Sequence, residues 1–323
     1  MSIKTRKIAI VGAGHVGSHC GFSLVTQGVC DELLMIDIDE AKAHSQALDL
    51  ADAVAYLPHH VKIKSANLLE CSDCDMIVIS AGPLPKENQT RLDTLSSTIE
   101  VIDTIIPLIM ESGFDGIFIV ISNPVDVVAN YIHKVSGFDK RKVIGTGTCL
   151  DSSRLRRLIS SEIDIAQHSI QAYSMGEHGD SQMVPWSHVY VGGKPLLTLM
   201  TENPDTYGRL DLKALVERTA KSGWDVLFGK GSTEFGIGTT LAEVVKTIYH
   251  NEQKVIPVST LLQGEYNQQD VYASVPAIVG KEGVQSIIEI NLTPDEVEQF
   301  NQSCTILKDY NKKSFEYSKL IFK

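Results

Sequence analysis

The sequence predicts an α/β fold, with a doubly wound parallel sheet in the first half of the chain and an α+β arrangement in the second. Short runs dense in Val and Ile recur through the first half without polar alternation, as strands buried on both faces do. Stretches with helical periodicity separate these runs, which indicates right-handed crossovers between parallel strands. In the second half, two strand-like runs each end in glycine and favour an antiparallel pair.

The elements of the first half follow from these patterns. We expect strands at 7–11, 32–37, 61–63, 75–80, 116–122 and 142–147. We expect helices at 16–27, 41–54, about 92–112 and 125–135.

The second half is expected to begin with a helix near Asp151. An alternating segment at 169–175, a helix-like segment at 212–228 and antiparallel strands at 255–264 and 271–280 follow. Thr293 predicts the cap of a terminal helix, with Pro next and Glu three residues on. Val297, Phe300, Cys304 and Leu307 are expected on the buried face of that helix. We place the domain boundary between 1–149 and 150–323, and the absence of a linker indicates a broad interface between the two halves.

Composition excludes several classes of protein. The chain has 323 residues, of which 43% are hydrophobic and 21% charged, and this excludes fibrous and disordered proteins. No apolar run is long enough to span a membrane. The net charge of −11 argues against nucleic-acid or anionic-membrane partners. Six cysteines without an export signal predict reduced thiols in the cytoplasm, and the CxxC at 71–74 lacks a second ligand pair, so we expect no metal.

A glycine motif, GAGHVG at 12–17, follows the first strand and opens a helix. Gly12 permits a tight turn, Gly14 lets the backbone approach a pyrophosphate, and Gly17 allows close contact between helix and strand. Asp37 stands 20 residues beyond Gly17, where a carboxylate accepts hydrogen bonds from a ribose and repels a 2′-phosphate. The motif predicts a Rossmann-type domain that binds NAD; the alternative is a glycine-rich turn beside an acidic strand end.

Two further loops leave strand ends, where open α/β sheets bind ligands. SAGPLPKENQTR at 80–91 delivers Arg91 to the start of the next helix. In ISNPVD at 121–126, Asn123 precedes Pro124 and is therefore held out of helical geometry.

A candidate catalytic group lies in the second half. Asp151 and Arg154 are three residues apart and share a helix face, whereas Arg156 points elsewhere. His178 stands in a loop between two glycines, where it has little apolar packing. Alternatively, Asp151 caps its helix with Arg154 as ion-pair partner, and His178 is a surface residue. Together with a dinucleotide fold, these residues favour hydride chemistry on a carbonyl.

These motifs, with TRL at 90–92 and KGST at 230–233, occur in the order found in the lactate/malate dehydrogenase superfamily, and the chain resembles its L-lactate dehydrogenases over essentially its whole length. The resemblance implies reversible hydride transfer between NADH and pyruvate, in a homotetramer with helix 41–54 at one subunit contact.

The resemblance also implies residue roles. His178 would donate and accept the proton, Asp151 would orient it, and Arg154 would clamp the substrate carboxylate. Arg91 would polarise the carbonyl from a closing loop, while Asn123 and Thr233 would contact the substrate. The positions that match cofactor contacts are Gly12, Gly14, Val16, Gly17, Asp37, Lys42, Ala81, Gly82, Thr104 and Asn123.

The chain departs from the family pattern at the specificity loop. Pro85 stands where lactate dehydrogenases carry Gln, with Leu84 before it and Lys86 after it. Pro85 cannot donate a hydrogen bond, and a dicarboxylate would leave one carboxylate unpaired unless Lys86 turned inward. We therefore expect a monocarboxylic 2-oxo acid, pyruvate first and a longer chain such as 2-oxoisocaproate next, with malate dehydrogenase as the nearest rival.

An allosteric site is also altered. Many bacterial relatives bind fructose 1,6-bisphosphate through an Arg and a His; Arg156 matches the former, but Gln171 replaces the latter. We expect weak or absent activation. Two other classes stay open: a metal-dependent NAD glycosidase and a non-catalytic NAD sensor.

Overall fold

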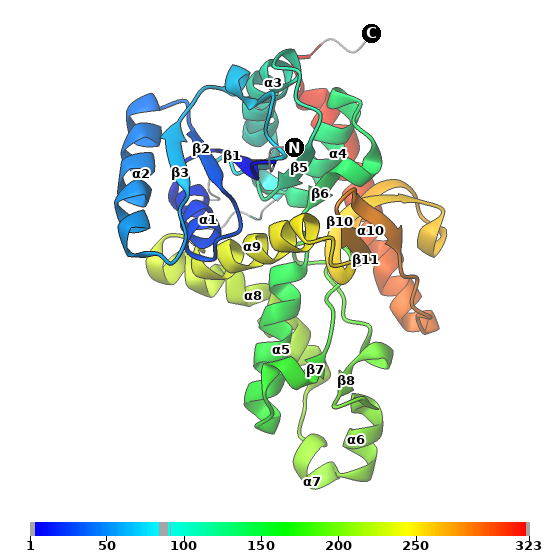
Figure 1. Cartoon of the computed structure of the whole chain (residues 1–323). Coiled ribbons are helices and arrows are strands. Elements are labelled where there is room, and N and C mark those ends of the chain that lie inside the picture. The colour runs from blue at the N-terminus through cyan, green and yellow to red at the C-terminus, as the bar shows by residue number, and fades with distance from the viewer. Residues whose placement is uncertain (1–3, 84–89, 91, 321–323) are drawn as a thin grey trace.

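The parallel sheet of the first half lies in the larger, upper body of the molecule, and a smaller lobe extends below it (Figure 1). The computed structural model describes residues 4–83, 90 and 92–320. The predicted α/β fold with six parallel strands is confirmed. These strands are β1 (Lys7–Val11), β2 (Glu32–Ile36), β3 (Lys62–Ser65), β4 (Met76–Ile79), β5 (Ile117–Val120) and β6 (Val143–Gly145).

The order of the parallel strands is β6-β5-β4-β1-β2-β3, so β1 lies between β4 and β2. The chain changes direction across the sheet at this point, which leaves a crevice beyond the carboxyl ends of β1 and β4. The helices of this half are α1 (His15–Thr26), α2 (Glu40–Ala53), α3 (Leu95–Glu111) and α4 (Val125–Ser136).

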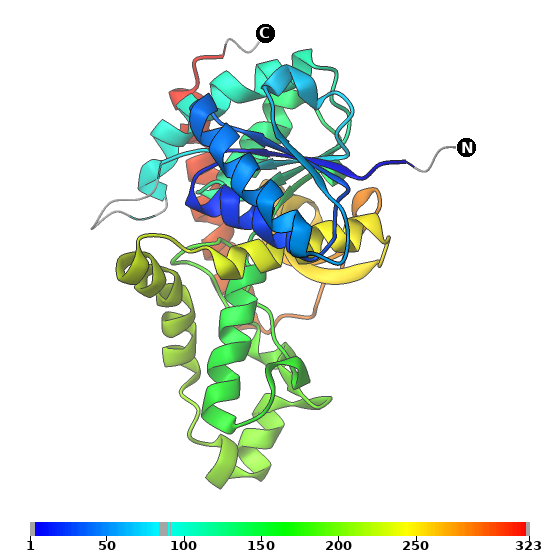
Figure 2. The same cartoon turned by 60° about the vertical axis from the view of Figure 1, so that its left-hand side comes forward.

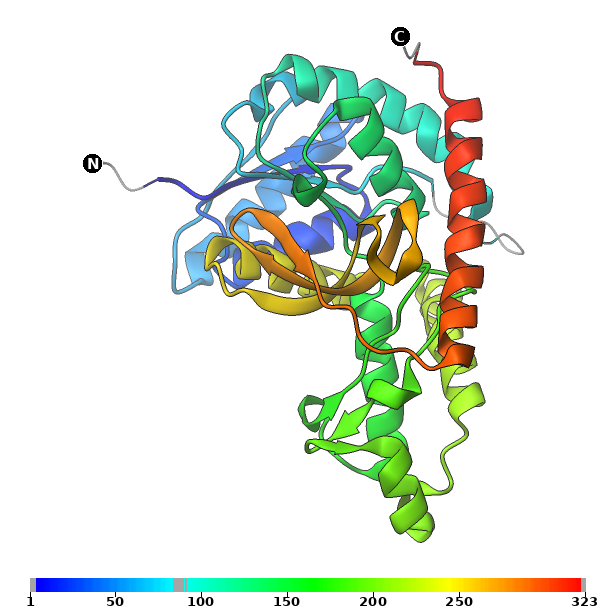
Figure 3. The same cartoon turned by 90° about the vertical axis from the view of Figure 1, so that its right-hand side faces the viewer.

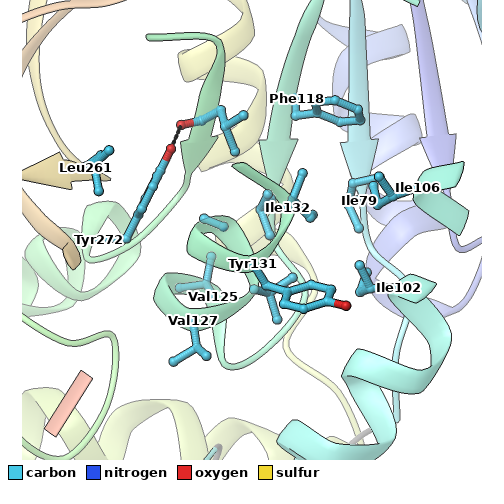
Figure 4. Close-up of a cluster of buried hydrophobic side chains, with 14 of the residues drawn as sticks. Ile79, Ile102, Ile106, Phe118, Val125, Val127, Tyr131, Ile132, Leu261 and Tyr272 are labelled. Atoms are coloured by element: carbon cyan, nitrogen blue, oxygen red, sulfur yellow. Dashed lines mark hydrogen bonds between the residues drawn. The ribbon is translucent and has the colours of Figure 1, made fainter. Parts of the chain in front are cut away.

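Each strand sends alternate side chains into one of two cores. On β1, Ala9 and Val11 join the cluster shared with α3 and α4, whereas Ile8 and Ile10 join the one shared with α1 and α2. Figure 4 shows the first of these cores, in which Ile102 and Tyr131 lie against strand residues such as Ile79. Burial on both faces is why these strands lack polar alternation.

The second half contributes three strands to the same sheet. The predicted antiparallel pair is confirmed as β10 (Lys254–Gln263) and β11 (Gln269–Gly280). β10 also pairs antiparallel with β6, and β12 (Gly283–Ile287) pairs with β11, so the sheet has nine strands over the described residues. The edge of the parallel sheet is thereby covered by strands that are distant in sequence.

The lower lobe contains a small sheet, β7 (Ile170–Gln171), β8 (Tyr190–Val191) and β9 (Lys194–Pro195), with its own core. Figure 2 shows α5 running down into this lobe with α8 beside it. The helices of this half are α5 (Cys149–Ile163), α6 (Leu196–Glu202), α7 (Pro204–Tyr207), α8 (Leu212–Lys230), α9 (Phe235–Tyr249) and α10 (Pro294–Tyr317).

Three details of the second half differ from expectation. The sequence analysis missed α9, whose apolar residues pack on α1; glycines at 236 and 238 obscure its helical pattern. The alternating segment at 169–175 is mostly irregular, with strand structure only at β7 and a bridge between Met175 and Met183. Val297 was predicted to be buried on α10 but is 40% exposed.

Helix α10 runs along one side of the molecule, from the level of the lower lobe to the top (Figure 3). Its predicted capping box is confirmed: Thr293 Oγ1 accepts a hydrogen bond from the Glu296 N–H, and the Glu296 carboxylate accepts one from the Thr293 N–H. Phe300, Cys304 and Leu307 are buried as predicted. None of the described helices is both long and apolar enough to cross a membrane.

Candidate active site

The glycine turn after β1 has the geometry of a phosphate cradle. Gly12 has φ +104°, and a Cβ there would lie 2.5 Å from the Ser80 carbonyl oxygen. A Cβ on Gly17 would lie 1.8 Å from the Gly12 carbonyl oxygen, so only glycine allows α1 to approach the turn this closely. A Cβ on Gly14 would meet nothing within 4 Å, which leaves open space before the start of the helix.

Asp37 closes this turn from the end of β2. Its Oδ2 accepts a hydrogen bond from the Ala13 N–H at 2.7 Å and lies 3.1 Å from Lys42 Nζ, while Oδ1 accepts one from the Asp39 N–H. Burial alone would raise the pKa of Asp37, but the two N–H groups and the Lys42 ammonium together lower it. The group is therefore a carboxylate at neutral pH, suited to accept hydrogen bonds from ribose hydroxyls.

These residues fit a dinucleotide. No side chain caps the N-terminus of α1 at Gly14, and its first turn contains no acidic residue, so its N–H groups can receive a pyrophosphate. Asn123 Oδ1 is buried and has no hydrogen-bond partner among the described residues. A buried amide oxygen without a donor is costly, and a bound ligand could supply one.

The strand ends beside β1 carry the other predicted cofactor positions. Ser122 Oγ donates to the Ala81 carbonyl oxygen, and Gly82, at φ +139°, lies against Thr98. Thr104 is exposed on α3 and donates to the Val101 carbonyl oxygen of its own helix. The structure does not bring Thr104 to the cavity described below, and its cofactor role stays a prediction.

The structure brings together the three charged residues of the predicted catalytic group. His178 Nδ1 lies 2.5 Å from Asp151 Oδ2, and Arg154 Nη1 donates to Asp151 Oδ1 at 2.9 Å. The Asp151 side chain is 1% exposed, that of Arg154 10% and that of His178 13%. Asp151 is therefore a buried carboxylate between the Arg154 guanidinium and the His178 imidazole. The alternative that Asp151 caps α5 is wrong, because the N-cap is Thr148 and no side chain caps the helix.

The loop of His178 is held from several sides. The backbone of Gly176 pairs with Ser274 on β11, and the Glu177 N–H donates to Ser303 Oγ on α10 at 2.8 Å. The Glu177 carboxylate accepts hydrogen bonds from the N–H and the hydroxyl of Ser181. These contacts tie the loop to the large sheet and to α10, so His178 is anchored rather than free on the surface.

One cavity joins the two halves of the site. Its lining includes five predicted residues, namely Val16, Asn123, Arg154, His178 and Thr233. The imidazole and guanidinium thus share a space with Val16 at the start of α1 and with Asn123 in the loop after β5. This arrangement can hold a small anion against a dinucleotide and offer it a proton.

Comparisons with known proteins place this geometry in a family. Residues 6–145 match the model described as lactate/malate dehydrogenase, NAD binding domain, and residues 148–318 match lactate/malate dehydrogenase, alpha/beta C-terminal domain. The chain belongs to the lactate/malate dehydrogenase family.

Individual relatives are L-lactate dehydrogenases. The chain is 47% identical over 312 residues to L-lactate dehydrogenase 3 of Bacillus cereus, covering 97% of this chain and 99% of that protein. It is 44% identical to an L-lactate dehydrogenase of Fusobacterium nucleatum, covering 95% and 96% of the two chains. The ligand-bound structure of a minor L-lactate dehydrogenase from Enterococcus mundtii has a TM-score of 0.92 at 38% identity, covering 96% and 99% of the two chains.

Four further predicted site residues either fall outside the part of the chain that the structure describes or do not line the cavity. Arg91 and Pro85 fall outside the described residues. Arg156 donates from its Nε to the Ser152 carbonyl oxygen of α5, and Gln171 is exposed on β7. Neither of these two lines the cavity.

Sequence analysis missed the apolar part of the cavity wall. Leu150 on α5, Trp224 and Leu227 on α8, and Ile237 on α9 all line it. The apolar spacing of α8 could have identified a buried face. It could not have shown that this face is turned toward a ligand cavity instead of the core.

Proposed function

We propose that this chain is an NAD-dependent L-lactate dehydrogenase that interconverts pyruvate and L-lactate. The observation that carries the proposal is the His178–Asp151–Arg154 group, which opens into a cavity shared with Val16 of the dinucleotide turn and with Asn123. A sensor of NAD would not need a proton donor and an anion clamp side by side, and this favours an enzyme.

In this proposal the glycine turn, Asp37 and Asn123 hold NAD, and the chemistry that the nicotinamide supplies when bound is hydride transfer. The Asp37 carboxylate favours NAD because it repels the 2′-phosphate of NADP. Asn123 Oδ1 or its amide group would face both the cofactor and the substrate.

His178 holds and moves the proton. Its Nδ1 faces Asp151, so the proton on the other ring nitrogen is directed at the substrate oxygen. In pyruvate reduction the imidazolium donates this proton as the carbonyl becomes an alcohol, and in lactate oxidation the neutral ring takes it back. Asp151 favours the imidazolium through its charge and fixes the orientation of the ring.

Arg154 orients the substrate. One guanidinium nitrogen is occupied by Asp151, which leaves other N–H groups of the planar fork for a carboxylate. Arg91, which lies outside the described residues, completes the proposal as the group that polarises the carbonyl.

The cavity wall favours a substrate with one carboxylate. Arg154 is the cationic side chain of the described lining and His178 its one titratable partner, and Leu150, Trp224 and Leu227 provide apolar surface beside them. A second carboxylate would be desolvated without a partner there, which costs several kcal/mol. Pro85, with Leu84 before it, provides no hydrogen-bond donor either.

NADH oxidation across a panel of 2-oxo acids tests this function. We expect kcat/KM for pyruvate or 2-oxoisocaproate to exceed that for oxaloacetate by at least about tenfold. A tenfold change corresponds to about 1.4 kcal/mol, and leaving a second carboxylate without a partner in the cavity costs more than this. A preference for oxaloacetate would instead identify a malate dehydrogenase. Turnover that survives a metal chelator excludes the metal-dependent glycosidase.

The same panel with fructose 1,6-bisphosphate tests the altered allosteric position. Gln171 has no charge with which to bind a phosphate, so Arg156 alone would have to hold the ligand. We expect the KM for pyruvate at neutral pH to stay unchanged when the sugar is added. A sharp fall in KM would contradict this.

We further propose a homotetramer in the cytoplasm, with α2 at one subunit contact. All six cysteines are free and buried, as suits a reducing compartment, and burial raises the pKa of the Cys20 and Cys304 thiols to about 12. Light scattering of the purified protein measures the assembly, and the mass of a monomer would contradict this proposal.

A further inference from the structure

A second acidic side chain, Asp126, contacts His178 at its main chain, whereas Asp151 contacts its ring. Asp126 is the second residue of α4, three residues beyond Asn123, and its side chain is buried at 2% exposure. It does not line the cavity, so it has no direct contact with a substrate there.

The contacts of Asp126 reach the His178 loop. Its Oδ2 accepts a hydrogen bond of 2.8 Å from the His178 N–H. Its Oδ1 lies 3.4 Å from Ser274 Oγ, which donates to it. Asp126 thus joins α4 of the dinucleotide domain to the loop that carries the proton donor.

The hydrogen bonds around Ser274 leave both oxygens of the Asp126 carboxyl group as acceptors. Ser274 Oγ accepts a hydrogen bond of 3.1 Å from the Thr148 N–H, so its own proton is available for Asp126. These acceptor roles suit the carboxylate form, which Asp126 takes above its pKa of about 6. The position in the first turn of α4 also favours a negative charge.

Other charged groups surround this carboxylate. The charge that His178 carries when protonated lowers the pKa of Asp126, whereas the charge of Glu177 on the same loop raises it. The thiol of Cys304 on α10 also interacts with the charge of Asp126. Beyond His178, Asp151 and Arg154 form an ion pair with each other. His178 therefore contacts two buried acidic side chains, Asp151 at its ring and Asp126 at its main chain.

We infer that Asp126 is a positioning residue that holds the His178 main chain and, through its negative charge, keeps the imidazole protonated to higher pH. This inference rests on the proposed function, because a retained proton is what pyruvate reduction needs. If Asp126 only held the loop in place, its hydrogen bonds would be sufficient. The role inferred here also requires the negative charge of its carboxylate.

The energetics of Asp126 support a functional role. Burial raises the pKa of Asp126 to about 6, although the His178 N–H and the positive charge of His178 lower it. Because the folded pKa lies above the unfolded value, the folded state binds more protons, and stability falls as pH rises from about 4 to about 6. Above that range an ionised Asp126 costs stability, which is a sign of a group retained for activity.

The Asp126→Asn variant separates the charge from the hydrogen bonds, since an amide can accept from the His178 N–H. In the variant we expect the His178 imidazole, followed by NMR, to lose its proton about one pH unit lower than in the wild type. For pyruvate reduction, kcat/KM at pH 8 should fall about tenfold, and at pH 6 by less than about twofold. The Kd for NADH, measured by fluorescence, should stay within about twofold, and Tm at pH 8 should not fall.

Asp103→Asn is the matched control, because Asp103 is another buried aspartate whose hydrogen bonds go to Tyr131, Ser318 and Lys319. It should leave the His178 titration and the pH profile unchanged. An unchanged His178 titration in Asp126→Asn would overturn the inference.

A second variant covers the case in which Asp126→Asn does not fold. Ser274→Ala removes a donor to the carboxylate and should shift the His178 titration and the pH profile in the same direction by a smaller amount. An unchanged titration there would also overturn the inference. Failure of the proposed function is distinct, since the wild type would then not oxidise NADH with any 2-oxo acid, while the NMR titration still reports on Asp126.

Discussion

Replacing His178 with alanine should abolish turnover while NADH still binds. The imidazole is the group in the described cavity placed to donate a proton, with Asp151 fixing it from behind at 2.5 Å. Loss of a general acid typically lowers kcat by 10² to 10⁴, and we expect about a thousandfold here. Steady-state NADH oxidation with saturating pyruvate measures the loss.

The control for this variant is cofactor binding. His178 does not belong to the glycine turn or to the Asp37 group, so the Kd for NADH by fluorescence should change by less than about twofold. A variant that kept most of its turnover would refute the proposed mechanism. A variant that lost NADH binding as well would show that His178 supports the fold of the site rather than the proton transfer.

Replacing Arg154 with lysine should weaken the enzyme for pyruvate although the positive charge is kept. Lysine cannot present two parallel N–H donors to a carboxylate and also reach Asp151, as the guanidinium does. Each hydrogen bond to a charged group contributes about 1.5–3 kcal/mol, so losing one should lower kcat/KM by about 10- to 150-fold. This loss should appear mainly as a higher KM for pyruvate, measured by initial rates over a range of pyruvate concentrations.

The same helix offers a matched control. Arg156 lies two residues further along α5, does not line the cavity and donates from its Nε to the Ser152 carbonyl oxygen of the same helix. Arg156→Lys should leave kcat/KM for pyruvate within about twofold of the wild type, because surface changes of this kind have small effects. Equal losses in the two variants would mean that α5 responds to substitution in general, and would argue against a carboxylate clamp at Arg154.

His178 is positioned by an aspartate from each half of the chain, so both halves contribute to the proposed proton transfer. Asp151 comes from the start of α5 and Asp126 from the start of α4, so the two anions beside His178 are fixed by different helix N-termini. A rigid placement of this kind lowers the reorganisation required when charge develops on the substrate. Helix α10 and strand β11 hold the loop of His178 through Ser303 and the backbone of Ser274.

The amino-acid sequence by itself determined the α/β class, the parallel strands and the glycine turn. These features depend on short-range causes: apolar runs that must be buried on both faces, and glycines whose φ or close contacts exclude a side chain. The pairing of Asp151 with Arg154 was also accessible, because three residues on a helix share one face.

Only the tertiary structure decided which distant groups meet. Asp151 and Asp126 are 27 and 52 residues from His178, and no local pattern encodes these contacts. The same holds for β10, which joins the first sheet through a single residue pair with β6, and for Trp224, which faces the cavity rather than the core. Such contacts depend on how whole elements pack, since burial sets which faces are covered but periodicity does not identify their partners.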